Sequence, residues 1–168
     1  MERRTKLLLG VLCVLLVCGV GLLVYLVLQP GEFRCVFCGE RMEVRAYFLN
    51  DSLDPEVTCT KVFPVSRDVP RTDGVARTAL GVLFRGPTEE ERARGYSSAI
   101  PIGVSVRTLS IQDGVAYVDL SAELDRGVGG SCRVTAIRSQ IVETLKQFPT
   151  VQDVVISIDG NSADILQP

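Results

Sequence analysis

An uncharged apolar run from Leu7 to Leu28 limits what this chain can fold into more than any other feature of its sequence. The run reads LLLGVLCVLLVCGVGLLVYLVL. As a helix it would rise about 1.5 Å per residue, enough to cross a hydrocarbon core of about 30 Å. A helix in a globular core would carry a polar stripe on one side, and this run has none. The run therefore predicts a transmembrane helix that acts as a signal anchor.

Two other functions for the run are open at this point. A cleaved signal peptide usually has an apolar region of about 7–15 residues followed by small residues, whereas this run is longer and continues into Gln29 and Pro30. A lipoprotein signal at Cys18 would need a small residue before that cysteine, where the chain has Val17. We favour the uncleaved anchor over both alternatives.

The charges beside the run predict its orientation. The head of the chain contains Arg3, Arg4 and Lys6, which the positive-inside rule places in the cytoplasm. The protein is then a single-pass protein of the cytoplasmic membrane, with its N-terminus inside and its bulk outside. The predicted parts are a cytoplasmic head at 1–6, a transmembrane helix at 7–28, a juxtamembrane linker at 29–43 and an extracytoplasmic domain at 44–168.

The charge of the outer part narrows the choice of partners. Without the head and the anchor the chain has 15 basic and 19 acidic side chains, a net charge of about −4. Nucleic acids bind basic faces, and anionic lipids attract clustered lysine and arginine. We therefore expect no nucleic acid partner, and contact with the membrane only through Leu7 to Leu28.

Hydrophobic periodicity predicts strands and helices in the outer part. Thr88 and Glu91 form a capping box that starts a short helical turn. The pair Asp113-Gly114 supplies the positive φ angles of a tight hairpin. The predicted strands are 44–49, 57–63, 105–111, 115–120 and 151–158, and the predicted amphipathic helices are 75–83 and 131–148.

This order of elements predicts the α/β (α+β) class. We expect a single mixed sheet in the order β-β-α-β-β-α-β, with both amphipathic helices on one face and the other face partly open. A binding surface is expected on the sheet edge or on the open face, where a partner strand can add.

Catalytic chemistry finds little support in the sequence. The chain has no histidine, which removes imidazole as a general base and as a metal ligand. The acids Asp119, Glu123 and Asp125 could chelate calcium, but a solvated strand end is the better interpretation. The Gly-rich turn before Ser131 resembles a phosphate cradle but lacks its lysine, so we interpret Ser131 as a helix N-cap. No catalytic, cofactor-binding or metal-binding residue is predicted.

The cysteines outside the predicted anchor leave alternatives open. They are Cys35, Cys38, Cys59 and Cys132. Cys35–Cys38 and Cys59–Cys132 are both plausible disulfides in an oxidising compartment, and the sequence does not choose between connectivities. A thiol-redox or zinc-binding function at Cys35 and Cys38 is the alternative functional hypothesis, although zinc sites usually show a second close pair of cysteines.

A set of segments in the outer part is similar to a known family. The segments are VRAYFLN (44–50), RTALGVLFRGPT (77–88), SAIP (98–101), IQDGVAYVDLS (111–121), GGS (129–131), QIVETLKQFPTV (140–151) and VVISIDG (154–160). In this order they resemble the GerMN (Germane; sporulation and spore germination) domain of bacterial envelope proteins. The likeness covers 44–168.

The resemblance implies a compact α/β domain similar to the ring-building modules of sporulation complexes. It also implies a protein that is membrane-anchored or a lipoprotein, and that has no known catalytic activity or cofactor. We expect a non-catalytic, membrane-tethered extracytoplasmic module linked to sporulation, spore germination or cell-envelope assembly. Its expected partners are envelope or sporulation proteins or peptidoglycan, and an oligomer is compatible with the family.

Overall fold

The computed structural model describes residues 18–19, 40–163 and 165–166. The chain divides into two units, residues 1–38 and 39–168, and the second is described below. Within the described ranges no helix is long and apolar enough to cross a membrane. The predicted anchor at 7–28, apart from Cys18 and Gly19, and the pair Cys35 and Cys38 lie outside the described residues.

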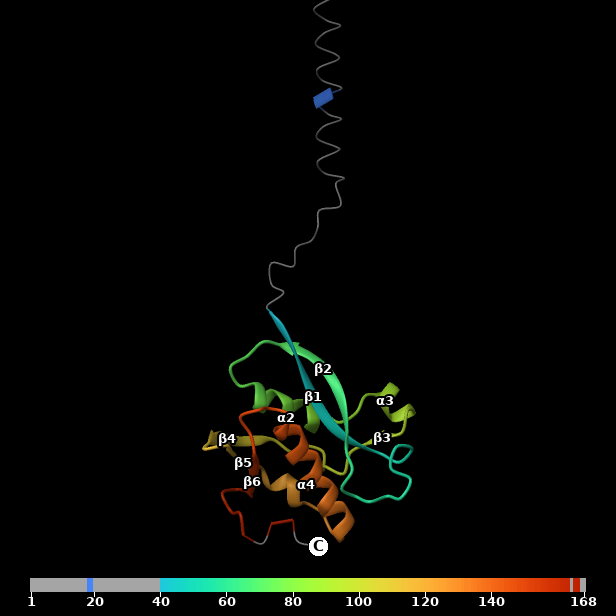
Figure 1. Ribbon diagram of the computed structural model, residues 1–168, viewed down its shortest axis with the longest axis vertical. Coiled ribbons are helices and arrows are strands. Elements are labelled where there is room, and N and C mark those ends of the chain that lie inside the picture. Colours follow the sequence, from blue (N-terminus) through green and yellow to red (C-terminus); the bar gives the residue numbers. More distant parts are fainter. Residues whose placement is uncertain (1–17, 20–39, 164, 167–168) are drawn as a thin grey trace, which may run out of the picture. The chain divides into compact units, whose positions relative to one another are not determined.

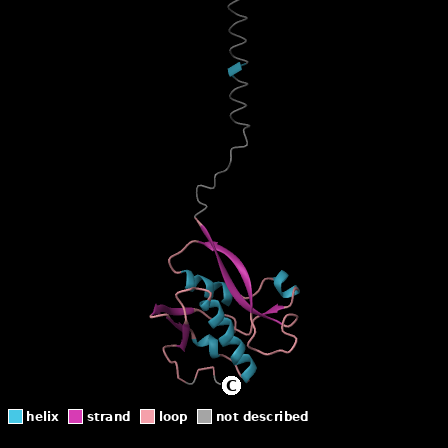
Figure 2. Cartoon of the chain, viewed as in Figure 1, coloured by secondary structure: helices cyan, strands magenta, loops and turns pink. Residues whose placement is uncertain are grey.

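The domain contains six strands, three α-helices and a short 3-10 helix within its described part (Figure 1, Figure 2). The strands are β1 (Arg41–Asn50), β2 (Phe63–Pro70), β3 (Tyr96–Ser97), β4 (Val106–Gln112), β5 (Val115–Leu120) and β6 (Asp153–Ile158). The helices are α2 (Val75–Phe84), α3 (Glu89–Ala93), α4 (Ser131–Lys146) and the 3-10 helix η1 (Ala122–Asp125). The predicted α/β class is confirmed.

The strands form two three-stranded sheets instead of the single sheet predicted. One has the order β2-β1-β3, and the other has the order β4-β5-β6. All pairs in the first sheet are antiparallel, whereas β5 and β6 in the second are parallel. The second edge of β1 does not pair with β4, β5 or β6, because side chains from α4 and its C-cap bond the backbone of Arg45 and Tyr47 there, and β3 pairs with Leu49 and Asn50.

Both long helices bury apolar faces in a core shared by the two sheets. Helix α4 contacts β1 and β6, while α2 contacts α4, β1 and β4. Fully buried side chains from every layer meet there: Phe48, Leu80, Leu83, Leu120, Leu124, Ile137, Ile141 and Leu145. Burial of each such side chain contributes about 1.5–3 kcal/mol, so this core is the main source of the domain's stability.

The edge of β1 is covered by polar side chains of α4. Gln147 acts like a neighbouring strand, because its Oε1 accepts from Arg45 N at 2.8 Å and its Nε2 donates to Arg45 O at 2.7 Å. One turn earlier, Thr144 Oγ1 accepts from Tyr47 N at 3.1 Å. The fully buried Gln140 donates to Tyr47 O at 3.2 Å, and its Oε1 accepts from Ala99 N at 2.9 Å. Backbone groups that a strand would otherwise satisfy are thus satisfied by a helix.

Two local predictions are confirmed by hydrogen bonds. Asp113 and Gly114 have φ angles of 48° and 83° and join β4 to β5 in a two-residue hairpin. Thr88 and Glu91 form the capping box of α3. The buried Glu91 carboxylate also accepts hydrogen bonds from Nη1 and Nη2 of Arg67 on β2, at 2.6 and 2.5 Å. Hydrogen bonds from Arg67 lower the pKa of Glu91, although desolvation by burial opposes them.

Two other predictions are wrong. The strand predicted at 57–63 is a turn-rich loop, and the strand instead begins at Phe63. Val57 and Cys59 have φ angles of 49° and 62°, and this left-handed conformation ends any extended run. The N-cap of α4 is Gly130, with a φ of 88° and no side-chain cap, and Ser131 is the first helical residue.

Gln140→Leu should destabilise the domain by about 1–3 kcal/mol, because the partly buried Ala99 N and Tyr47 O would lose their hydrogen-bond partner. Urea unfolding of the full chain in detergent, followed by tyrosine fluorescence, measures the change. Gln152→Leu is the matched control: Gln152 is exposed, so the change should stay within about 0.5 kcal/mol. Equal effects of both variants would contradict the structural function assigned to Gln140.

Candidate functional site

A pocket of about 520 Å³ lies between the loop after β1 and the N-terminus of α4. Its walls combine apolar and charged side chains with the exposed backbone of the Gly-rich turn. The lining residues are Leu49, Asn50, Asp51, Asp54, Val57, Cys59, Lys61, Ala99, Gly129, Gly130, Ser131, Cys132, Arg133 and Ala136.

Asn50, at the end of β1, shapes the start of the pocket loop. Its side chain is 3% exposed, and its Oδ1 accepts from Ser52 N at 3.0 Å and from Leu53 N at 3.2 Å. Its Nδ2 donates to Arg94 O at 3.1 Å, and a Cβ at Gly95 would lie only 3.2 Å from Oδ1. The hydrogen bonds of the buried Asn50 side-chain amide therefore fix the direction in which the loop leaves β1.

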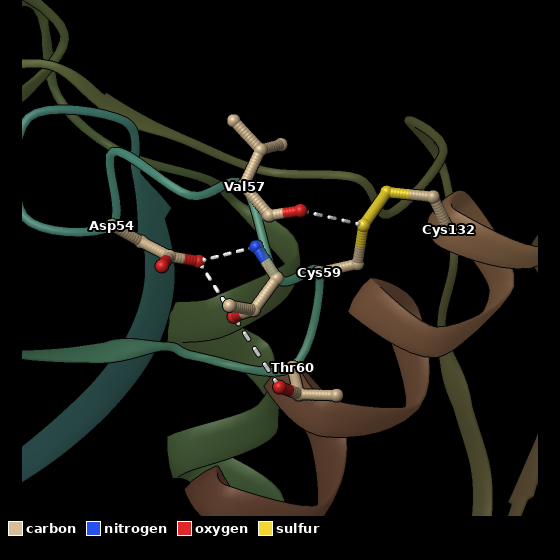
Figure 3. The surroundings of a disulfide bond; sticks show 6 residues. Asp54, Val57, Cys59, Thr60 and Cys132 are labelled. Carbon is tan, nitrogen blue, oxygen red and sulfur yellow. Dashed lines mark hydrogen bonds between the residues drawn. A yellow bond between two sulfur atoms is a disulfide. The ribbon is translucent and has the colours of Figure 1, made fainter.

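Asp54 holds the middle of the loop and faces a lysine. Its Oδ2 accepts from Thr58 N at 2.8 Å and from Thr58 Oγ1 at 2.7 Å (Figure 3). Lys61 Nζ lies 3.3 Å from Oδ1, which is an ion-pair distance, but no described residue gives Oδ1 a well-oriented hydrogen bond. The hydrogen bond from Thr58 lowers the pKa of Asp54, with burial opposing it and Lys61 adding to it.

A disulfide joins Cys59 and Cys132, which both line the pocket (Figure 3). It joins residues 73 apart in sequence, with their Cα atoms 5.3 Å apart, and so fastens the loop to the first turn of α4. The sulfur of Cys59 also lies 3.4 Å from Val57 O. This is a contact and not a hydrogen bond, because a disulfide sulfur has no proton to donate. Of the pairings that the sequence left open, the described part of the chain contains this one, while Cys35 and Cys38 lie outside the described residues.

Val57 stands at the mouth of the pocket in an unfavourable backbone conformation. Its φ is 49°, which is rare for a β-branched residue, and its side chain is 60% exposed. Leu53 in the same loop is 52% exposed. Backbone strain of this kind costs on the order of 1–3 kcal/mol and tends to occur at functional sites. The loop therefore presents apolar side chains to solvent at the expense of local stability.

The N-terminus of α4 forms the opposite wall. Gly129 and Gly130 precede the helix, and its first N–H groups receive no side-chain cap. The Arg133 guanidinium donates hydrogen bonds to two carbonyl oxygens of earlier residues, Ala99 O at 3.3 Å and Gly127 O at 3.0 Å. The wall therefore offers positive charge and free donors. Because the other wall contains Asp51 and Asp54, the pocket suits a ligand with both acceptor and donor groups.

The acidic residues considered as a calcium site do not form one. Asp119 Oδ1 accepts from Ser157 Oγ at 2.8 Å and from Gly160 N at 2.7 Å, and its Oδ2 lies 3.3 Å from Arg107 Nε. Glu123 pairs with Arg126 at 3.3 Å. In the part of the chain that is described, no group of three potential ligands is placed to hold a metal ion.

Two of the four cysteines outside the predicted anchor, Cys59 and Cys132, are not available as zinc ligands, and the other two are not described by the structure. Cys59 and Cys132 are oxidised to a disulfide and so supply no thiolate, which removes a site built on all four cysteines. The thiol or zinc hypothesis for Cys35 and Cys38 stays a prediction, because both lie outside the described residues.

Sequence reasoning found part of this site. It noted the Gly-rich turn, which it interpreted as a helix start, and a possible Cys59–Cys132 pair. It missed Lys61, which lay in the strand predicted at 57–63, and it missed Asn50 and Asp54, which lay between predicted strands. A usable signal was the spacing of Asp54 and Thr58, since an aspartate often accepts hydrogen bonds from residues a few positions later in a turn.

Fold and site together define a small α/β domain with a surface pocket that is lined by a disulfide-tethered loop. The chain belongs to the family described as Germane, sporulation and spore germination, whose family model matches residues 45–164. The resemblance seen in the sequence is thus confirmed. No curated protein matches the chain.

Solved structures support the same fold. The first GerMN domain of the sporulation protein GerM from Bacillus subtilis has a TM-score of 0.53 and 20% identity, with 72% of this chain and 85% of that chain covered. The tandem GerMN domains of the same protein have a TM-score of 0.55 and 16% identity, with 73% of this chain and 41% of that chain covered. This chain therefore spans about two fifths of the tandem structure.

Asp54→Asn should lower stability at neutral pH and cost less in acid. A carboxyl with a lowered pKa contributes stability above its unfolded value, near 3.8, and the contribution is lost as the pH falls through the lower folded value. Unfolding free energies of both proteins from pH 7 to pH 2.5 should differ most near neutrality and converge below about 3.8. The exposed Asp51→Asn is the control. A gap independent of pH would contradict a charged Asp54 partnered by Thr58 and Lys61.

The double variant Cys59→Ser/Cys132→Ser should lose about 3–4 kcal/mol, because the disulfide closes a long loop and restricts the unfolded chain. Hydrogen exchange measured by mass spectrometry should also rise in the pocket loop, near Asp54 and Val57, before it rises in α4. Cys18→Ser is the control and should leave both quantities unchanged. An unaltered exchange pattern in the double variant would show that the loop holds its position without the disulfide.

Proposed function

We propose that this protein is a non-catalytic binding module on the outer side of the cytoplasmic membrane, tethered by Leu7 to Leu28 and engaged in sporulation, spore germination or envelope assembly. The Cys59–Cys132 disulfide is the observation that carries the proposal. Structural disulfides form and persist in oxidising compartments and are rare in the cytosol. The same disulfide lies in the wall of the pocket and fastens its loop to α4, so the bond that favours an oxidising compartment also shapes the proposed site.

The charges of the head support the proposed topology. Arg3, Arg4 and Lys6 precede the apolar run, which favours an inside N-terminus. Lipidation at Cys18 is the alternative means of attachment, and it would place the domain on the same side. Either attachment keeps the disulfide in an oxidising setting.

The absence of histidine and the lowered pKa values of four carboxyl groups support a binding function over a catalytic one. The chain has no histidine. The pKa values of Asp54, Glu91, Asp119 and Glu123 are all lowered, which favours ionised carboxylates, whereas a general acid at neutral pH needs a raised pKa. These carboxylates are suited to structure and recognition.

The pocket's chemistry supports a protein segment or a wall peptide as the ligand. Exposed Val57 offers an apolar contact, while Lys61 and the first N–H groups of α4 offer polar ones. A peptide provides amide donors, carbonyl acceptors and apolar side chains together. The net charge of about −4 beyond the anchor disfavours nucleic acid.

Val57→Asn should separate folding from binding. Asparagine tolerates a positive φ better than valine, so the variant should be as stable as the wild type or more stable by up to about 1 kcal/mol. It should nevertheless recover less protein or wall material when the tagged full chain is pulled down from detergent-solubilised envelopes.

Ile102→Asn is the matched control for this pull-down, because Ile102 is 98% exposed but lies outside the pocket lining. Equal losses with both variants would indicate non-specific adhesion of apolar side chains. Recovery of neither a protein nor a wall fragment by the wild type would count against the binding function. Loss of function in Cys35→Ser/Cys38→Ser, together with bound zinc or reactive thiols, would favour the redox or zinc alternative.

A further inference from the structure

Most sheet edges of this domain are blocked. On β2, Arg71 N donates to Glu40 O at 2.7 Å, so the backbone of Arg71 faces β1. In an antiparallel ladder the backbone groups of alternate residues face opposite edges. Those of Pro70, and of every second residue before it, therefore point away from β1. Pro64 and Pro70 have no N–H to offer. The carbonyl groups of Ser66 and Asp68 each accept from an arginine guanidinium, at 3.1 and 2.8 Å. This edge cannot accept a further strand.

Two other edges are covered by the chain itself. The free edge of β1 is occupied by the polar side chains of α4 described above. On β6, Ile158 pairs with Asn161 through two backbone hydrogen bonds of 2.8 and 2.9 Å. The N–H of Val154 donates to the carboxylate of Asp153 at 2.8 Å. The edge of β1 is therefore covered at Arg45 and Tyr47, and the edge of β6 is covered at both ends but not at Ile156.

The outer edge of β4 is different. The two-residue turn makes Gln112 and Val115 a hydrogen-bonded pair, so the backbone groups of Leu109 and Ile111 point away from β5. Arg77 covers the start of this edge by donating to Val106 O at 2.7 Å. Among the described residues, none donates to or accepts from the outward groups of Leu109 and Ile111. Ile111 is also 40% exposed, although it lies opposite buried Ala116.

We propose that a second copy of this chain pairs with this open edge, β4 against β4 in antiparallel orientation around a two-fold axis at Ser110. The axis makes Leu109 and Ile111 of each copy a hydrogen-bonded pair, which gives four backbone hydrogen bonds between the copies. A six-stranded sheet results, and the contact is isologous. This pairing goes beyond the proposed function, because it depends on neither the pocket nor the compartment.

The side chains of β4 complement themselves in this register. Apolar Leu109 faces apolar Ile111 of the second copy, which covers the exposed isoleucine. Thr108 faces Gln112, a pair that can hydrogen-bond. Arg107, at the bulge between Val106 and Thr108, is paired with Asp119 and Asp159 of its own copy. From Thr108 to Gln112 the strand carries no charge, so no like charges oppose each other. Cross-strand pairs of these kinds each favour antiparallel pairing.

Cysteine cross-linking of the full chain in membrane vesicles tests this register. Ser110 is exposed and would sit opposite Ser110 of the second copy, so Ser110→Cys should form a disulfide-linked dimer under mild copper-phenanthroline oxidation. Thr108→Cys should not, because the two Thr108 positions would be about 14 Å apart, beyond disulfide reach. The double variant Thr108→Cys/Gln112→Cys should restore the cross-link. Peptide mapping by mass spectrometry separates these bonds from those of the native cysteines.

Sedimentation of the full chain in detergent tests the energetics. Ile111→Lys should raise the dimer dissociation constant at least about tenfold, because it places a charge beside Leu109 of the second copy.

Two outcomes would overturn the proposal. One is equal cross-linking of Ser110→Cys and Thr108→Cys, which would indicate random collision. The other is a chain that stays monomeric and forms no Ser110→Cys cross-link. If such a monomer recovers another protein from envelopes and Ile111→Lys abolishes that recovery, the edge binds a foreign strand and not a second copy.

Discussion

The hydrogen bonds between the polar face of α4 and the edge of β1 are the interaction on which the rest of this domain depends. Gln147 and Gln140 satisfy backbone groups of Arg45 and Tyr47 that a strand would normally satisfy. The helix is thereby fixed against the first sheet while its apolar face packs on β6 of the second. Its N-terminus is then in position to meet the loop after β1, where the disulfide and the pocket are built.

The same arrangement explains why the surface offers few places for recognition. Prolines and arginines block β2, α4 covers β1, and the chain beyond β6 covers part of β6. Blocked edges prevent uncontrolled strand addition. What is left is a pocket whose loop keeps Val57 in a left-handed conformation, and the open edge of β4. Both features depart from the local regularity seen elsewhere in the domain, and departures of this kind tend to mark functional surfaces.

Local sequence signals predicted much of the fold. The Asp113-Gly114 hairpin and the capping box of Thr88 and Glu91 could both be predicted from the sequence, because each is determined by residues within a few positions of one another. The strand at 57–63 was misread because its β-branched composition favours extension. Hydrogen bonds from Thr58 to Asp54 and the disulfide at Cys59 instead hold that segment in a compact loop. A local side-chain hydrogen bond and one tertiary link, the disulfide, together overrode the strand preference there.

By itself the sequence determined the α/β class, the family, the position of the long helices and the absence of imidazole chemistry. These follow from periodicity and composition, which are properties of neighbouring residues. Only the tertiary structure decided that the strands form two sheets, that Cys59 pairs with Cys132 and that Asp54 and Lys61 meet at a pocket. The physical reason is that α4 brings together segments more than 70 residues apart, and no local pattern encodes which distant segment a helix will pack against.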